Sequence, residues 1–346
     1  MKLYFQSFLT LIGLLLSCYA IAGKITYNLP FYGPASSIFL PKENPNMLIS
    51  VEEESGHVFL QEQGKEEVFD FGPSEIPASV SANGKFIAIF HEGTLKVWDI
   101  DLKSLILEKN IDSYDGSLRF VKQLSISPEG KFISVINSHH DAFLIDLQAR
   151  LSFFKFKKYS NISSVSFPYF GTKQKQVALA RNDGTVIFHD LSAKKTITSL
   201  PYDFESPISR FSWIGDIKLA IASFNRREIK IFSEPNHSPS IIRSTYGVTS
   251  NGYEVDLDAY NIAFSADGKN YLYLYQEQDD FGSFNDLILE YGCLNTLKKT
   301  KVKGLGINKY SKLSLSPKGN FLAITDYDGA KVFVKAMGEI RENLDH

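Results

Sequence analysis

Cysteine is scarce in this sequence: only Cys18 and Cys293 occur among its 346 residues. Zinc sites made of clustered cysteines and frameworks of several disulfides both need more cysteines than this. If the first 22 residues are removed, as argued below, Cys293 is the only cysteine left and no intramolecular disulfide can form. We therefore expect a fold held by packing, with no cofactor.

An excess of charge is also missing. The chain has 37 Lys and Arg against 39 Asp and Glu, which gives a net charge of −2. Nucleic acids and anionic membranes attract proteins mainly through surplus positive charge. We expect no nucleic-acid partner and no general attraction to a membrane.

Long hydrophobic runs are absent except for residues 8–16, which are too few to span a bilayer. Lys2 precedes this run, and Ala20-Ile21-Ala22 after it is typical of a signal-peptide cleavage site. We predict a signal peptide over residues 1–22 and an exported chain over 23–346, either periplasmic or secreted.

A competing interpretation uses the same segment. Leu15-Leu16-Ser17-Cys18 looks like a bacterial lipoprotein box. In that case a lipid on Cys18 would anchor the chain in the envelope, and only then do we expect contact with a membrane.

A repeated cassette organises the rest of the chain. In Leu124–Val135, apolar and polar residues alternate, Pro128-Glu129-Gly130 forms a turn, and a second β-rich run follows. Close copies begin at Val80, Phe264 and Leu315, and weaker ones at Ile38, Val165 and Phe211. The spacing of about 40–50 residues is typical of propeller blades, and the seven copies predict seven blades.

A second half-motif follows each cassette. Its clearest form is Gly93-Thr94-Leu95-Lys96-Val97-Trp98-Asp99, a third strand after a glycine-containing hairpin. Together the two halves resemble the WD40-repeat family over about residues 24–340, although the Gly-His dipeptide of that family is absent. The Ser-Pro-Glu-Gly-Lys cassette also resembles the repeat of TolB-type periplasmic propellers.

No linker divides the chain, so we predict one all-β domain, a seven-bladed β-propeller. A propeller leaves exposed sheet edges unless its first and last blades are joined. We therefore expect Ile25–Asn28 to complete the last blade as its outer strand, next to residues 331–335. We expect a monomer.

Binding is expected on the face where loops enter the inner strands, because these loops carry aromatic residues. Phe31, Phe71, Tyr260 and Tyr310 belong to this group, and the alternative is that such rings pack as local core. The hairpins between second and third strands should share this face. The candidate partner-binding residues are Tyr32, Tyr114, Tyr159, Tyr202, Phe204, Tyr253, Arg226, Arg227 and Phe281.

Catalytic signatures are missing: the sequence has no nucleophile elbow, zinc-protease helix, phosphate-binding loop or dinucleotide glycines. His139-His140-Asp141 suggests a metal site, but adjacent strand residues point to opposite faces, so we expect no metal there. We predict a non-enzymatic scaffold for a protein or peptide. The alternative is a periplasmic hydrolase or lactonase at the channel mouth, using Glu254, Asp256 and Asp258.

Overall fold

The computed structural model describes most of residues 25–337. The residues outside the description are 1–24, 77, 114–115, 148–151, 157–160, 168–175, 182, 184, 192–194, 201–209, 215–217, 224–227, 233–239, 244–257, 279–283, 295–298, 303–306, 309, 327 and 338–346.

The described strands form seven four-stranded antiparallel sheets. Sheet 1 contains β2 (Ala35–Phe39), β3 (Met47–Glu52), β4 (His57–Glu62) and β5 (Phe69–Pro73). Sheet 2 contains β6 (Ser79–Val80), β7 (Phe86–His91), β8 (Thr94–Asp99) and β9 (Ser104–Asn110). Sheet 3 contains β10 (Val121–Ile126), β11 (Phe132–Asn137), β12 (Ala142–Asp146) and β13 (Ser152–Lys155). Sheet 4 contains β14 (Ile162–Ser166), β15 (Gln176–Arg181), β16 (Val186–Asp190) and β17 (Lys195–Leu200).

The remaining sheets come from the second half of the chain and from its first strand. Sheet 5 contains β18 (Arg210–Ile214), β19 (Lys218–Ser223), β20 (Glu228–Phe232) and β21 (Ser240–Arg243). Sheet 6 contains β22 (Asp258–Phe264), β23 (Asn270–Gln278), β24 (Phe284–Cys293) and β25 (Lys299–Val302). Sheet 7 contains β26 (Leu313–Leu315), β27 (Phe321–Thr325), β28 (Lys331–Ala336) and β1 (Ile25–Asn28).

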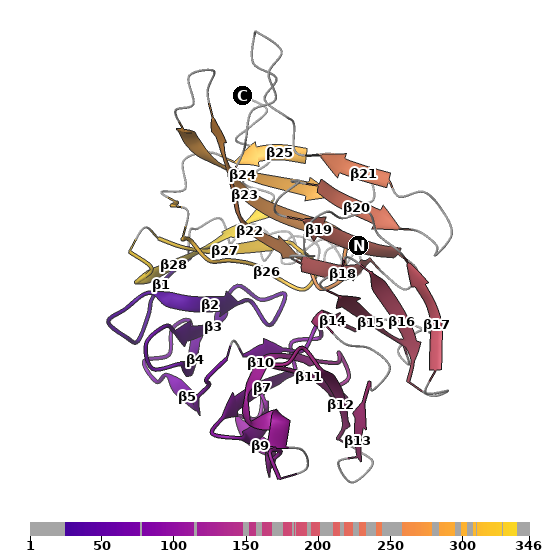
Figure 1. Cartoon of the computed structure of the whole chain (residues 1–346). Helices are drawn as coiled ribbons and strands as arrows, with labels where there is room; N and C mark the ends of the chain where they lie inside the picture. The colour runs from indigo at the N-terminus through magenta and orange to yellow at the C-terminus, as the bar shows by residue number, and fades with distance from the viewer. Residues whose placement is uncertain are drawn as a thin grey trace, which may run out of the picture.

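First strands of neighbouring sheets contact one another in the pairs β6–β10, β10–β14, β14–β18, β22–β26 and β26–β2, which makes them the inner strands. Figure 1 shows the sheets placed around a common centre in chain order. A 3-10 helix, η1 (Gly116–Arg119), precedes β10. No helix of the described residues is long and apolar enough to cross a membrane.

The hydrophobic core lies between sheets. Between sheets 1 and 2, for example, Val51 and Leu60 pack with Ile87 and Ile89, and all four are almost fully buried. This layout follows from the sequence, because central strands such as β7 are apolar on both faces and each face packs against a neighbouring sheet.

The first and last described strands of the chain pair in sheet 7. β1 pairs antiparallel with β28, and Ile25 lies opposite Val334. β1 is therefore the outer strand that the sequence predicts there. Glu43, from the turn after β2, joins sheet 1 to sheet 7. Its carboxylate accepts hydrogen bonds from Ser316 Oγ (2.7 Å) and from the backbone N–H of Lys318 (2.7 Å).

Four turns between first and second strands repeat one geometry. We call them the cassette turns: Ser81–Phe86, Ser127–Phe132, Ser265–Asn270 and Ser316–Phe321. In each, the buried serine hydroxyl accepts a hydrogen bond from the backbone N–H five residues later, at 2.9–3.0 Å. Each also has a glycine with φ between 66° and 75°, a conformation that glycine adopts without strain. These turns define one end of the ring, the cassette face.

Candidate functional site

The opposite end, the loop face, consists of the connections entering the inner strands and the hairpins between second and third strands. Backbone hydrogen bonds join the two kinds of segment. The N–H of Glu53, in the β3–β4 hairpin, donates to Pro34 O before β2 (3.1 Å), and the N–H of Ser138, in the β11–β12 hairpin, donates to Phe120 O before β10 (2.7 Å). The predicted sharing of one face by these segments is therefore seen at sheets 1 and 3.

Of the nine candidate partner-binding residues, only Tyr32 is described. Its side chain is fully exposed in the loop between β1 and β2. The others lie outside the described residues, as does the alternative lipidation site Cys18, so these stay predictions: Tyr114, Tyr159, Tyr202, Phe204, Tyr253, Arg226, Arg227 and Phe281.

Three large aromatic side chains of the loop face are exposed. Tyr32 precedes β2, Phe120 precedes β10 with 60% of its side chain exposed, and Tyr310 precedes β26 with 70% exposed. Sequence reasoning missed Phe120, although its position directly before an inner strand was an available signal. These rings represent three of the seven entering loops.

Phe71, one of the aromatic residues expected in the entering loops, lies elsewhere in the structure. It lies within β5, not in the loop that follows, and is only 2% exposed. Its ring packs against Trp98 at 5.8 Å between centroids. The pairing of β4 with β5 shifts by one residue here, and the bulge turns Phe71 into the core. Local core packing is therefore the correct interpretation for this ring.

A recurrent bulge marks where the inner strands reach the loop face. Register shifts between first and second strands leave four equivalent residues unpaired: Ser36, Lys122, Ser163 and Tyr260. The two serines use their hydroxyls locally, since Ser36 Oγ donates to Val51 O (3.3 Å) and Ser163 Oγ donates to Ala180 O (3.1 Å). Lys122 has no hydroxyl, and its side chain is exposed.

Acidic side chains dominate the loop face at sheets 1 and 2. We call this group the acidic arc, and its exposed members are Glu53, Glu54, Glu75 and Glu92. Glu75 accepts a hydrogen bond from the backbone N–H of Glu92 at 2.8 Å, which ties two loops of sheet 2 together. Glu75 Oε1 also lies 3.7 Å from His91 Nδ1, and the side chains of all four glutamates are exposed.

The loop face at sheet 3 carries the opposite charge. Arg119 and Phe120 stand before β10, Lys122 is the bulge residue of β10, and His139 is exposed in the β11–β12 hairpin. We call these four residues the sheet-3 patch. The Arg119 guanidinium lies 5.9 Å from the centre of the Phe120 ring.

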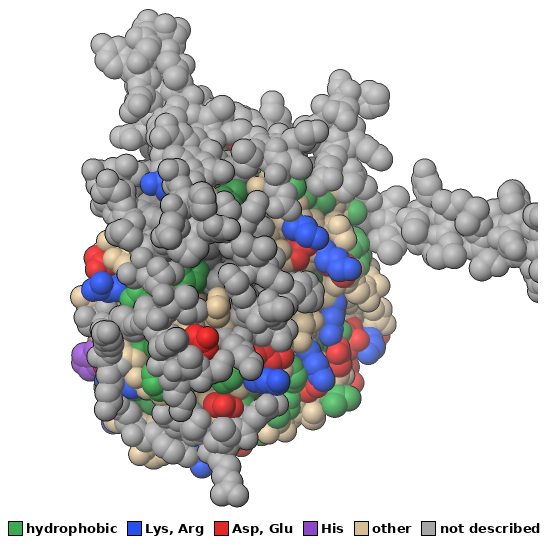
Figure 2. Space-filling model, turned by 90° about the vertical axis from the view of Figure 1, so that its right-hand side faces the viewer, with side chains coloured by type: hydrophobic (Ala, Val, Ile, Leu, Met, Phe, Trp, Pro, Cys, Tyr) green, Lys and Arg blue, Asp and Glu red, His purple; other side chains and the backbone are tan. Residues whose placement is uncertain are grey.

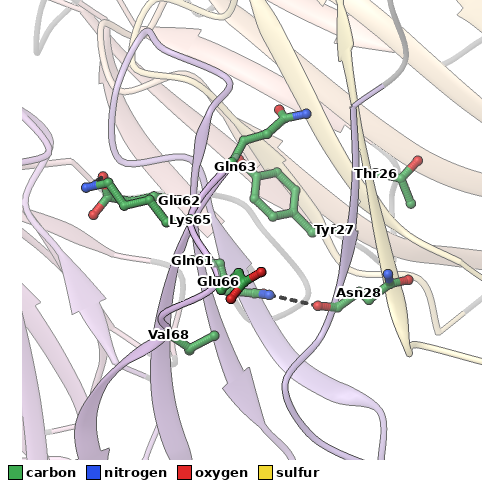
Figure 3. Close-up of a pocket in the computed structure, with 10 residues that line it drawn as sticks. Thr26, Tyr27, Asn28, Gln61, Glu62, Gln63, Lys65, Glu66 and Val68 are labelled. Carbon is green, nitrogen blue, oxygen red and sulfur yellow. Dashed lines mark hydrogen bonds and ion pairs between the residues drawn. The ribbon is translucent and has the colours of Figure 1, made fainter.

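A pocket of about 240 Å³ lies elsewhere, between β1 and the β4–β5 turn. Figure 3 shows the Tyr27 ring between these segments and the bond from Gln61 Nε2 to Asn28 O (2.7 Å). Hydrogen bonds from Lys65 and then Lys103 hold the pKa of Glu62 below its usual range. Burial, with the nearby Glu62 charge, raises the pKa of Tyr27, whose hydroxyl donates to Pro45 O. The Gln61 and Tyr27 hydrogen bonds join sheet 7 to sheet 1, and the Glu62–Lys103 ion pair joins sheet 1 to sheet 2.

Neither a scan against protein-family models nor a search of curated protein sequences finds a match. Among solved structures, the chain matches the β-propeller domain of Cps50 (Swd1) from Myceliophteria thermophila with a TM-score of 0.60 and 13% sequence identity. The match covers 90% of this chain and 99% of that domain. This chain has the β-propeller fold.

The predicted all-β propeller is thus confirmed as a fold. Sheets 1–7 are numbered below as blades 1–7, and seven blades in a closed ring stay a prediction. At 13% identity the comparison bears on the fold alone. The resemblance to TolB-type repeats is not shown by it and stays a resemblance of sequence.

The structure describes only some of the residues considered for a metal site or for catalysis. His139 is exposed, whereas the carboxylate of Asp141 pairs with Lys155 at 2.8 Å. Within the described ranges, no three His, Cys, Asp or Glu residues are grouped as metal ligands would be. Glu254 and Asp256 lie outside those ranges, and the side chain of Asp258 is not described.

Proposed function

We propose that this chain is an exported, WD40-like β-propeller that binds a protein or peptide partner through its loop face. Seven blades would form one closed ring, with β1 completing the last blade, and the rigid ring would hold the loops in place. The chain would work without a cofactor and without catalysing a reaction.

The observation that carries the proposal is the exposure of Tyr32, Phe120 and Tyr310 on the same face. Aromatic rings make strong interface anchors because they bury a large apolar area at a small cost in conformational entropy. Rings elsewhere are used inside the fold: Trp98 packs between blades with Phe69 and Phe71, at centroid distances of 5.8 Å. Tyr32, Phe120 and Tyr310 instead expose most of their side chains on the loop face.

The charge distribution favours a protein or peptide partner over a nucleic acid. On the face in Figure 2, the described Lys and Arg side chains are interspersed with Asp and Glu. No broad field of one sign is visible there, so a protein segment with its own pattern of charges suits this molecule better than a polyanion such as a nucleic acid.

The first experiment is cross-linking and capture from the native envelope with wild-type bait and with Tyr32→Ala, Phe120→Ala and Tyr310→Ala baits. We expect each substitution to reduce the captured partner several-fold, with a folded ring by circular dichroism. The matched control is Ile106→Ala, since Ile106 is 53% exposed but lies on the outer strand β9. Capture that depends on Ile106 and not on the three rings would refute the loop-face proposal.

Export has a separate test. N-terminal sequencing of the mature protein should begin at Gly23, because Ala20-Ile21-Ala22 precedes it. Incorporation of labelled palmitate that is lost in Cys18→Ser would instead establish the lipid-anchored alternative.

A further inference from the structure

The bulge of blade 3 carries a lysine, Lys122, where the bulges of blades 1 and 4 carry a serine. At the same place in blades 1 and 4, a serine hydroxyl bonds to a carbonyl of the neighbouring strand. Blade 3 has a lysine there, so it gives up that local bond and exposes an ammonium group. A bulge commonly re-aims a side chain beside a functional site.

The sheet-3 patch is held rigidly around this lysine. Asn137, itself fully buried, accepts hydrogen bonds at Oδ1 from the N–H groups of His139 (3.0 Å) and Asp141 (2.9 Å). The hairpin is also joined to Phe120 O by the N–H of Ser138 and to blade 4 by the bond from Ile162 N to His140 O (2.9 Å). A pre-ordered patch loses little entropy when a partner binds.

The positive charge of the patch is not neutralised within the part of the chain that is described. Neither Arg119 nor Lys122 has an ion pair there, and the nearby Asp141 is occupied by Lys155. Arg119 and Lys122 therefore offer several N–H donors next to an exposed phenyl ring. Carboxylates are the groups in proteins that such donors bind best.

We propose that the sheet-3 patch binds an acidic, carboxylate-bearing peptide segment of the partner, with an apolar residue of that segment against Phe120. This proposal rests on the proposed function and specifies its partner. An anionic membrane is disfavoured, because the acidic arc on the same face would meet and repel a broad negative surface. The arc instead orients the partner, with the acidic part over blade 3 and away from blades 1 and 2.

The test uses a fluorescein-labelled peptide of alternating glutamate and leucine, with a lysine–leucine peptide as the charge control, read by fluorescence anisotropy. We expect the wild-type protein to bind the acidic peptide, and Lys122→Ser and Arg119→Ala each to weaken binding about tenfold. Lys131→Ser is the matched control, because Lys131 is an exposed lysine of the same blade on the cassette face. It should leave the affinity unchanged.

Lys122→Ser also tests whether the lysine is kept for structure. The serine can make the bond that Ser36 and Ser163 make, so the melting temperature should stay the same or rise. A clear fall in melting temperature, or equal binding by Lys122→Ser and wild type, would overturn the proposal. Binding of the wild type to phosphatidylglycerol vesicles, lost with Arg119→Ala, would overturn it in favour of a membrane.

Failure here is distinguishable from failure of the proposed function. If native capture depends on Tyr32 and Tyr310 while Arg119→Ala and Lys122→Ser leave it intact, the loop face binds a partner and the acidic segment is wrong. If no ring variant affects capture, the proposed function itself fails.

Discussion

On the cassette face, four turns repeat the same sequence pattern and hydrogen bonds, whereas the described connections of the loop face differ from one another in sequence. Ser81, Ser127, Ser265 and Ser316 all accept the same backbone hydrogen bond within their own turns. Tyr32, Arg119 and Lys122 on the other face have exposed side chains. Residues that recur along this chain therefore maintain the ring, and residues that differ between blades are the ones available to a partner.

Neighbouring cassette turns also pack directly against one another. The turn of one blade touches the turn of the next: Gly84 lies against Pro41, Gly130 against the Phe86 ring and Gly319 against Asn270. Loop-face glycines vary, since an added Cβ would meet no atom within 4 Å at Gly33 but would lie 2.2 Å from Ser74 O at Gly56. We expect substitutions in the cassette turns to reduce stability and substitutions of exposed loop-face side chains to reduce binding, and four predictions test that division.

The largest effect is expected for Gly84→Ala. Gly84 has φ +66°, and a Cβ there would lie 1.4 Å from the carbonyl oxygen of Pro41, so the two turns must separate. We expect a loss of more than about 4 kcal/mol in the free energy of unfolding, measured by urea denaturation. Gly64→Ala is the matched control, because Gly64 has φ +80° but no atom within 4 Å. It should cost only the backbone strain of about 1–2 kcal/mol, and equal losses in the two variants would contradict the packing argument.

The second prediction concerns Glu43, which supplies blade 7 with an acceptor that its own turn lacks. Asn83 and Asp267 accept the serine hydroxyl within their turns (2.7 Å), but Lys318 occupies the equivalent position in blade 7. Glu43→Ala should cost about 2 kcal/mol in the free energy of unfolding, since it removes charged hydrogen bonds.

Lys318→Asp provides the rescue in that experiment. It would place a carboxylate where Asp267 has one, so the double variant Glu43→Ala/Lys318→Asp should regain most of the lost stability. Glu54→Ala, at an exposed glutamate of the loop face, should stay within about 0.5 kcal/mol of wild type. No rescue would mean that Glu43 stabilises the junction by some means other than this cap.

The same contacts explain what the sequence could and could not predict. Local patterns were sufficient for the cassette turns and for the placement of Ile25–Asn28 beside β28. They could not predict that Glu43 caps a turn 273 residues away, because nothing near Glu43 in sequence indicates its partner. The position of Phe71 and the exposure of Lys122 both depend on bulges, which change the alternation of strand faces without leaving a composition signal.

The third prediction compares two equivalent positions, occupied by Trp98 in blade 2 and by His189 in blade 4. Trp98 of blade 2 packs on two phenylalanines, and His189 of blade 4 packs in the same way on Phe154 (5.6 Å) and Phe156 (5.0 Å). Burial lowers the pKa of His189 below its usual value, and its Nδ1 has no hydrogen-bond partner in the described structure.

The fold therefore favours neutral His189. Its contribution to stability is fully present above the unfolded-state pKa of about 6.5 and is lost as pH falls below that value toward the folded-state pKa. The melting temperature should fall between pH 7 and pH 5, and the fall should be smaller in His189→Phe. An identical pH profile for the two proteins would show that this histidine does not titrate during unfolding.

The smallest effect on stability is expected for Tyr32→Ser. Tyr32 is fully exposed, so its replacement should change the free energy of unfolding by less than about 0.5 kcal/mol. Capture of the partner should nevertheless decrease, because a loop-face ring is lost. Trp98→Ser is the contrasting variant: it should destabilise the ring by about 3 kcal/mol, since Trp98 packs between blades 1 and 2. If Tyr32→Ser instead destabilised the ring and left capture unchanged, the division between a structural face and a binding face would be wrong.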